Sequence, residues 1–240
     1  MQQYQSISQI SDPAAQLKKL AEMHGASIAF SSSFGLEDQV ISDMIFSNNI
    51  PIKVFTLDTG RLFPETYKVW NETLEKYNKI INTYYPKTKA VEALVTEKGP
   101  HSFYASVENR KECCEIRKVE PLKRALENID LWVTGLRAEQ SSARSNLDFF
   151  EKDASFGLVK FNPLKDWTFD ELKTYIKEHK VPYNKLHDEG FVSIGCQPCT
   201  RAVKAGEDFR AGRWWWESSS KECGLHAART NEPIINIKKL

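Results

Sequence analysis

Short apolar runs alternate with longer amphipathic segments through the first 135 residues, and this alternation constrains the fold more than any other feature. The strand-like runs, rich in β-branched and aromatic side chains, are residues 26–31, 51–58, 79–85 and 131–135. The segments with helical spacing are residues 13–25, 36–49, 63–78 and 120–130, with 168–180 further on. Strands that alternate with helices run parallel and are covered by them. The sequence therefore predicts an α/β fold: an open, mainly parallel sheet with helices on both faces.

Regular periodicity fades from Asn184 onward, where Gly, Cys, Arg and Trp accumulate. A chain of 240 residues is long enough to bury about 70% of its unfolded surface. We expect one α/β domain over residues 1–209, with a mobile Cys- and Arg-rich tail over residues 210–240 that does not fold independently. Irregular segments of this kind often carry functional residues.

The 33 basic and 32 acidic residues give a formal charge of +1. Such a chain has no general attraction for nucleic acid or for an anionic membrane surface, so neither is expected as a partner. It has no apolar run of about 18 residues or more, and its first residues lack the pattern of a secretory signal. A cytoplasmic location is the resulting expectation.

Four of the five cysteines form two pairs, the adjacent Cys113 and Cys114 and the Cys-x-x-Cys of Cys196 and Cys199. Neighbouring Cα atoms lie only ~3.8 Å apart, too close for an easy disulfide. In a reducing compartment, metal ligation or catalysis is the favoured use of such thiols. A zinc site, an iron–sulfur cluster, a redox disulfide and four small buried side chains all remain open. The doublet favours a cluster over zinc, because adjacent ligands can each reach a different iron.

Cys223 stands apart from these pairs, in a segment that also contains Lys221 and His226. Nearby cations lower the pKa of a thiol and increase its thiolate fraction, which is what a nucleophile requires. The alternative is an idle exposed thiol near the end of the chain.

Three loops that follow predicted strands carry residues suited to anions. Residues 31–35, "SSSFG", lie between a strand and a helix, where hydroxyl and backbone N–H groups can hold a phosphate. No Gly-Lys-Ser/Thr closes this loop, and a plain serine N-cap would also explain it. The other two loops are residues 56–66 and 134–146, the latter with Arg137 and Arg144. Such loops meet at the carboxyl edge of a parallel sheet, where nucleotides bind.

More cations precede a run of three tryptophans, Trp214 to Trp216. They are Arg201, Lys204, Arg210 and Arg213. Guanidinium groups pair bidentately with phosphate and sulfate oxygens, although single arginines are usually solvated and tryptophan runs usually serve packing.

Taken together, these motifs resemble those of the assimilatory adenylyl-sulfate (APS) reductases, within the wider PAPS/APS reductase family. The resemblance spans about residues 28 to 226 and is carried by "SSSFGLEDQV", "LDTGRLFPETY", "KECCEIRKVEPLKRAL", "TGLRAEQSSARS", "NPLKDWT", "VPYNKLHDEGFVSIGCQPCTRAV", "GRWWWE" and "KECGLH". It implies an adenine-nucleotide α-hydrolase-like fold, in agreement with the α/β pattern.

The resemblance also implies a chemistry. The four paired cysteines, Cys113, Cys114, Cys196 and Cys199, would hold a [4Fe-4S] cluster beside the substrate. Cys223 would attack the sulfur of adenosine 5′-phosphosulfate (APS), release AMP and become an S-sulfocysteine. Thioredoxin or glutaredoxin would then free sulfite by thiol exchange, as a step of sulfate assimilation and cysteine biosynthesis. Only 14 residues follow "KECGLH", so the reductant is expected to be a separate protein.

The resemblance also implies the remaining site residues. The cationic group expected to screen the anionic substrate is Lys118, Arg144, Arg210, Arg213 and the catalytic His226. The adenosine side is expected to contact Ser31, Ser32, Ser33, Phe34, Gly35, Asp38, Leu57, Asp58 and Thr59, with Gly135 and Arg137 closing the pocket. Lys118 follows Cys114 by four residues, about one helical turn, which would let it bridge cluster and substrate.

Relatives that use the 3′-phosphorylated substrate (PAPS) commonly lack both cysteine pairs, so APS is the expected substrate and PAPS the alternative. More distant alternatives are an ATP-pyrophosphatase-type nucleotide-activating enzyme and a tRNA-thiolating enzyme, whose loops typically carry Gly-Gly and a lysine. A zinc-stapled nucleotide-binding module is the non-enzymatic alternative. A homo-oligomer is compatible with the sequence, which does not specify the oligomeric state.

Overall fold

The structure is a computed structural model that describes residues 2–141 and 144–217. Its centre is a six-stranded sheet with the strand order β3-β2-β1-β4-β6-β5. The strands are β1 (Ile28–Ser31), β2 (Lys53–Leu57), β3 (Asn82–Tyr84), β4 (Leu131–Val133), β5 (Phe150–Asp153) and β6 (Leu158–Phe161). Every neighbouring pair is parallel except β5 and β6. The predicted mainly parallel α/β fold is confirmed.

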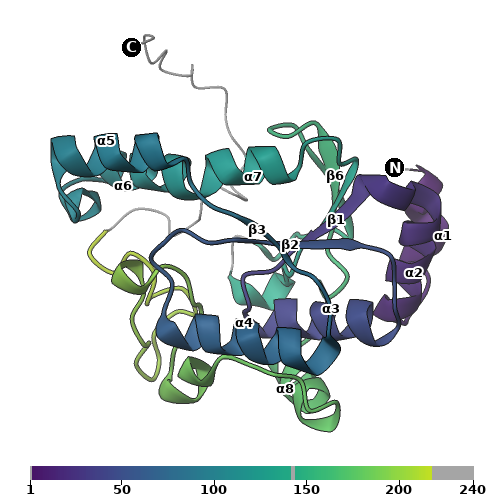
Figure 1. Cartoon of the computed structure of the whole chain (residues 1–240). Helices are drawn as coiled ribbons and strands as arrows, with labels where there is room; N and C mark the ends of the chain where they lie inside the picture. The colour runs from purple at the N-terminus through teal and green to yellow at the C-terminus, as the bar shows by residue number, and fades with distance from the viewer. Residues whose placement is uncertain (1, 142–143, 218–240) are drawn as a thin grey trace.

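Helices lie on both sides of this sheet (Figure 1). Below it in that view are α3 (Leu36–Ser47), α4 (Pro64–Tyr77) and α8 (Phe169–Glu178), and above it are α5 (Thr88–Lys98), α6 (Val107–Cys114) and α7 (Glu120–Ala125). The N-terminal α1 (Gln5–Ser8) and α2 (Pro13–His24) lie at one side. Short 3₁₀ helices span Gln2–Tyr4, Gly25–Ser27, Ser102–Tyr104, Ala138–Gln140, Lys185–Glu189 and Gln197–Cys199.

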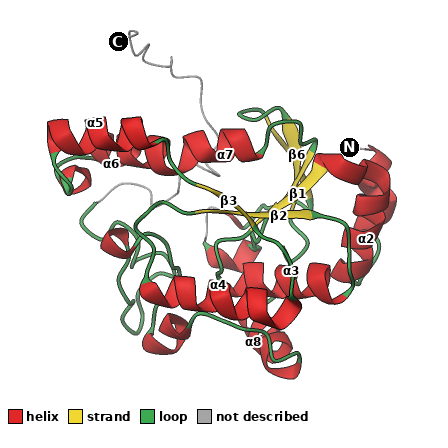
Figure 2. Cartoon of the chain, viewed as in Figure 1, coloured by secondary structure: helices red, strands yellow, loops and turns green. Residues whose placement is uncertain are grey.

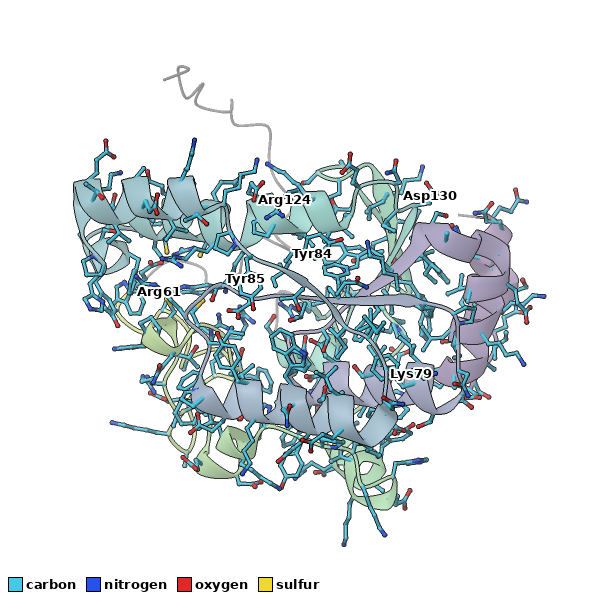
Figure 3. All side chains as sticks on the ribbon, in the orientation of Figure 1. Arg61, Lys79, Tyr84, Tyr85, Arg124 and Asp130 are labelled. Carbon is cyan, nitrogen blue, oxygen red and sulfur yellow. The ribbon has the colours of Figure 1, made fainter. Side chains whose placement is uncertain are left out.

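Two apolar layers hold the helices to the sheet. The larger includes Phe30 and Val133 of the strands and Val40 and Ile41 of α3, all with no exposed surface. The smaller packs α7 on the other face, where Leu122 meets strand residues such as Ala29 and Phe55. At the edge of this layer, the Arg124 guanidinium lies over the Tyr84 ring at 5.9 Å, and both side chains are labelled in Figure 3. No helix in the described ranges is both long and apolar enough to cross a membrane.

One helical stretch differs from its prediction. The sequence suggests a helix that starts near Pro121, whereas the structure is helical from Val107 to Ala125, with a π-helical turn at Glu115–Val119 between α6 and α7. Proline lacks the N–H that an α-helix needs at an interior position, and a π-turn changes the hydrogen-bond pattern before it. The π-turn therefore allows the helical path to pass Pro121, and it carries Lys118.

The β5–β6 hairpin, like α1 and α5, is an element that the periodicity does not reveal. The hairpin strand β6 lies on the side of β1 opposite β2 and β3 (Figure 2), and β5 forms the edge of the sheet. The turn has Gly157 at φ 68°, a left-handed conformation that glycine adopts without strain, and the Asp153 carboxylate accepts hydrogen bonds from Ser155 and Phe156 N–H. The hairpin extends the sheet beyond β4, so β4 lies inside the sheet.

Candidate active site

A cavity of about 230 Å³ opens at the carboxyl ends of β1, β2 and β4. The chain runs outward from β1 to β2 and β3, then returns to place β4 on the other side of β1, which makes this edge a topological switch point. Most of the predicted substrate residues line the cavity: Ser31, Ser32, Ser33, Phe34, Gly35, Asp38, Leu57, Thr59, Lys118, Gly135, Arg144, Arg210 and Arg213. The three loops therefore meet as expected.

The serine loop is held closed by a carboxylate of its own helix. Asp38, in the first turn of α3, accepts hydrogen bonds from the Ser33 backbone N–H and hydroxyl, both at 2.6 Å. Phe34 N–H donates to the Ser32 hydroxyl at 3.2 Å. Burial raises the pKa of Asp38 to about 7, against the lowering effect of the Ser33 hydrogen bonds. Two N–H groups that could have bound a phosphate are thus already used.

Gly135 lies so close to the Asp38 carboxylate that a side chain would not fit at this position. A Cβ atom there would lie 2.2 Å from Asp38 Oδ1 and 3.1 Å from the Glu37 side chain. The β4 loop therefore packs directly on the start of α3, and the absence of a side chain at residue 135 makes this approach possible.

The side of the cavity nearest the sheet is apolar and carries one oriented hydroxyl. Leu57, Leu122 and Trp132 line it. The buried Trp132 indole N–H donates to the Ser31 hydroxyl oxygen at 2.8 Å. Because this donor uses an acceptor position of the oxygen, the Ser31 proton is free to point toward a ligand. A flat apolar wall with a few directed polar groups suits a nucleobase.

The cavity lining also carries four cationic side chains. Lys118, Arg144, Arg210 and Arg213 contribute to the lining, and Arg210 and Arg213 are only 8% and 6% exposed. The Arg213 guanidinium packs against the backbone at Gly195, where a Cβ atom would lie 2.2 Å from Nη2. These buried cations form a local site for an anion in a chain of almost zero net charge.

The four paired cysteines converge on a second, small cavity of about 20 Å³. Cys113 and Cys114 come from the end of α6, and Cys196 and Cys199 from the turn over Gln197–Cys199. Figure 3 shows sulfur atoms close to the labelled Arg61, which also lines this cavity. Within the described residues, no three His, Cys, Asp or Glu side chains are grouped so as to hold a single metal ion. Lys118 lines both cavities.

The thiols of this second cavity differ in their electrostatics. Burial opposes ionisation of Cys196, but the Lys118 ammonium, a 3.2 Å hydrogen bond with the Thr59 hydroxyl and Arg213 together lower its pKa. Burial and the neighbouring Cys196 raise the pKa of Cys199 to about 12. The pKa is thus lowered at Cys196 and raised at Cys113 and Cys199.

Residues 210–217, the arginine–tryptophan segment, pack against the turn over Gln197–Cys199, the cysteine turn. Thr200 and Arg213 form an antiparallel bridge, and Arg201 N–H donates to the Gly212 carbonyl at 3.0 Å. A Cβ atom at Gly212 would lie 2.2 Å from the Arg201 carbonyl oxygen. Residues 210–217, which the sequence assigns to the mobile tail, are thus part of the packed structure.

Two predicted substrate residues among those that the structure describes, Asp58 and Arg137, do not line the cavity. Asp58 is buried and accepts hydrogen bonds from the Gly60 N–H and the Tyr67 hydroxyl. Arg137 has no exposed surface and forms ion pairs with Glu37 and Glu139. Both support the loops from behind. The catalytic candidates Cys223 and His226 lie outside the described residues.

The sequence reasoning also missed several residues of the wall, above all His187. Both nitrogens of its ring are buried without a hydrogen-bond partner among the described residues, and burial lowers its pKa. The other missed residues are Glu37, Thr56, Leu62, Thr66, Leu122, Trp132, Thr134, Leu136, Gln140, Val192, Ser193, Ile194, Gly195 and Phe209. Many lie in or beside the motifs that carry the resemblance, but no local pattern shows which side chains turn inward.

The chain is similar to known proteins along most of its length. The phosphoadenosine phosphosulfate reductase domain family matches residues 27–202. An adenosine 5′-phosphosulfate reductase of Sinorhizobium fredii is 48% identical over 225 residues, covering 93% of this chain and 89% of its own. Another, of Allochromatium vinosum, is 51% identical over 201 residues, covering 83% and 78%.

Solved structures of other proteins share the fold of this chain. A phosphoadenylyl-sulfate reductase from Candida auris, in a phosphate complex, has a TM-score of 0.68 and 30% identity, covering 82% of this chain and 96% of its own. An FMN adenylyltransferase of Candida glabrata, with a TM-score of 0.53 and 16% identity over 85% of this chain and 71% of its own, shares the fold alone.

Proposed function

The chain belongs to the phosphoadenosine phosphosulfate reductase family, and on that premise we propose that it is an oxidoreductase that converts APS to sulfite and AMP. The observation that supports this most is the pair of adjoining cavities, one built for a nucleotide anion and one lined by four cysteines, with Lys118 in both walls. The relatives named as APS reductases share 46–51% of their residues with this chain.

The four cysteines fit an iron–sulfur cluster better than a single ion. All four line one cavity, and three of them are buried. Thiolates are the ligands of such clusters, and Arg117 and Lys118 beside them would offset the negative charge of a thiolate-bound cluster. Cys113, Cys114, Cys196 and Cys199 would hold a [4Fe-4S] cluster, which would supply an electrostatic anchor beside the substrate.

In the nucleotide cavity, the proposed roles follow the chemistry of each wall. The apolar side with Ser31 and Leu57 would take the adenosine. Lys118, Arg210 and Arg213 would surround the phosphosulfate, screen its charge against an approaching thiolate and stabilise the charge that develops on the phosphate. His226 is proposed to assist there.

Cys223 is the proposed nucleophile. Its thiolate would attack the sulfur of APS, so that an S–S bond forms while the bond from sulfur to the phosphate oxygen breaks and AMP departs with that electron pair. A dithiol protein, thioredoxin or glutaredoxin, would then attack the Cys223 sulfur and expel sulfite; its second thiol would resolve the mixed disulfide. The dithiol is oxidised to a disulfide, and the sulfonate leaves as sulfite. A cytoplasmic location is part of this proposal.

The proposal favours APS over PAPS because both cysteine pairs are present. The test is sulfite release by anaerobically purified protein with thioredoxin, with APS and PAPS offered separately at equal concentration. We expect sulfite from APS and little from PAPS. Cys223→Ser should abolish release, whereas the nearby Ser220→Ala should not. Sulfite from the Cys223→Ser variant would contradict the nucleophile, and a brown, iron-loaded protein that releases sulfite from neither substrate would contradict the reductase.

A further inference from the structure

The last residue of the described chain is tied to the cysteine-bearing helix by a buried ion pair. The Glu217 carboxylate accepts two hydrogen bonds from the Arg110 guanidinium, from Nε at 2.9 Å and from Nη2 at 2.8 Å. The two side chains are only 6% and 4% exposed. Arg110 lies in α6, three residues before Cys113, whereas Glu217 lies six residues before Cys223.

Contacts around the pair connect it to both cavities. Two guanidinium groups lie near the Trp214 ring, that of Arg110 at 4.7 Å and that of Arg213 at 4.8 Å from its centroid. The backbone N–H of Trp214 donates to the Cys199 carbonyl at 3.2 Å, and the backbone N–H of Glu217 donates to the Trp214 carbonyl at 2.9 Å. Glu217 is thus fixed by its backbone and by its side chain.

Packing alone does not require a charged pair at this position. Two buried charges lose much of their hydration, and apolar side chains of the same volume often stabilise a fold at least as well. What a bidentate pair adds is direction, because the guanidinium fork accepts a carboxylate in one orientation. The pair therefore fixes where the chain leaves the folded part.

We infer that Arg110 and Glu217 are positioning residues that hold the base of the Cys223 segment on the cysteine-bearing helix and so limit the region that the thiol can reach. From Glu217, six residues span at most about 20 Å. Without the pair, Glu217 keeps only its backbone hydrogen bond to Trp214, which is itself bonded to the Cys199 carbonyl. A tether that starts at Trp214 is nine residues long instead of six and would lower the effective thiol concentration about twofold, and loss of direction adds to this. The inference rests on the proposed function of Cys223.

The test separates nucleophile delivery from nucleotide binding. Protein without reductant is mixed with APS, S-sulfonation of Cys223 is followed by mass spectrometry, and the affinity for AMP is measured in parallel. For Glu217→Gln we expect sulfonation to slow by about tenfold or more, while the AMP dissociation constant changes less than about twofold. The exchanged variant Arg110→Glu with Glu217→Arg should recover part of the rate. Glu112→Gln is the control and should behave as wild type. Glu112 lies in α6, as Arg110 does, but its ion pair with Lys98 of α5 is exposed.

A second measurement does not depend on the activity. Trypsin should cut after Arg213 faster in Glu217→Gln than in wild type or Glu112→Gln, because the segment has lost its anchor. If wild-type protein is not sulfonated by APS, the proposed function fails and the cleavage rates still decide whether the pair anchors the segment. Equal sulfonation and equal cleavage in Glu217→Gln and Glu112→Gln would overturn the inference, as would a parallel loss of AMP affinity.

Discussion

Ser31 shows how one buried neighbour can give a hydroxyl its direction. Alone, its hydroxyl could donate or accept, and it would discriminate little between ligand atoms. The Trp132 N–H, 2.8 Å away, occupies one acceptor position of the oxygen and leaves the Ser31 proton available to a ligand in the cavity. Trp132 itself packs edge-on to Phe156 at 5.8 Å, so a ring of similar shape would keep its place.

Trp132→Phe should therefore weaken nucleotide binding without slowing the chemistry. One hydrogen bond contributes about 0.5 to 1.5 kcal/mol, which corresponds to roughly a 2- to 12-fold rise in KM for APS and in the AMP dissociation constant, with kcat unchanged. Ser31→Ala is the matched control. If Trp132 acts through Ser31, adding Trp132→Phe to Ser31→Ala has no further effect, whereas additive losses would contradict this role.

Asp38 is a residue whose burial has a measurable consequence for stability. Its pKa is raised from 3.8 to about 7. The folded protein therefore holds a proton on Asp38 that the unfolded chain releases near pH 4. A raised carboxyl pKa contributes stability that is complete below the unfolded value and lost as the pH rises through the folded one.

The free energy of unfolding should accordingly fall between about pH 4 and pH 7 in wild type, by on the order of 4 kcal/mol from this group. Asp38→Asn should flatten this part of the profile, as measured by urea unfolding at a series of pH values. The exposed Asp170→Asn is the control and should leave the profile unchanged. Parallel profiles for wild type and Asp38→Asn would show that Asp38 titrates normally.

At the scale of elements, the cysteine turn and the arginine–tryptophan segment form one unit because Gly212 lets their backbones touch. Gly212→Ala should push residues 210–217 away from Arg201 and cost roughly 1 to 3 kcal/mol. Hydrogen exchange at the Arg201 and Trp214 N–H groups should rise selectively. Gly206→Ala in the same segment has a left-handed φ of 83° but no atom within 4 Å of the new Cβ. It should strain the backbone without raising this exchange; equal effects of both variants would contradict the close-contact explanation.

Elements with a clear hydrophobic period were predictable, and elements defined by tertiary contacts were not. β1, β2, α3 and α4 follow directly from local composition. The β5–β6 hairpin was missed because its first strand, "FEKD", alternates with charges and resembles a loop. The π-turn was not predicted either, because a proline such as Pro121 is found both at the start of a helix and just after a π-turn within one.

For the site, the positions of the loops could be predicted, whereas the contacts of individual side chains could not. Loop positions at the carboxyl edge followed from the parallel sheet, but the direction of a side chain did not. Arg137 illustrates this, because its motif is the same whether the guanidinium enters the cavity or, as observed, pairs with Glu37 behind it.

At the scale of the whole molecule, the apolar cluster around the cysteines is separate from the two layers on the sheet. It contains Leu94, Phe103 and Trp214 as well as three of the cysteines. In the proposed cluster-loaded protein, iron would join α6 to the turn over Gln197–Cys199, in addition to these apolar contacts and the Arg110–Glu217 ion pair. The sheet has its own core.

Removal of iron by an anaerobic chelator should therefore act locally. We expect loss of the brown colour and faster hydrogen exchange at residues 113–119 and 195–199, while β1 and β4 keep their protection. Denaturation by guanidinium provides the reference for exchange of the whole sheet. Exchange that accelerates across the sheet on chelation would show that the sheet depends on the metal, and a colourless loaded protein would favour zinc.

The wide spacing of the two cysteine pairs also sets an order of events during synthesis. About 80 residues separate Cys114 from Cys196, so a ribosome that adds about 5 to 20 residues per second produces the second pair roughly 4 to 16 s after the first. During this interval Cys113 and Cys114 are on a growing chain without their partners, and the cavity does not yet exist. A nascent chain therefore has to keep these two thiols reduced before it can acquire iron, and oxygen exposure in that interval would lower the yield of loaded protein more than exposure after folding.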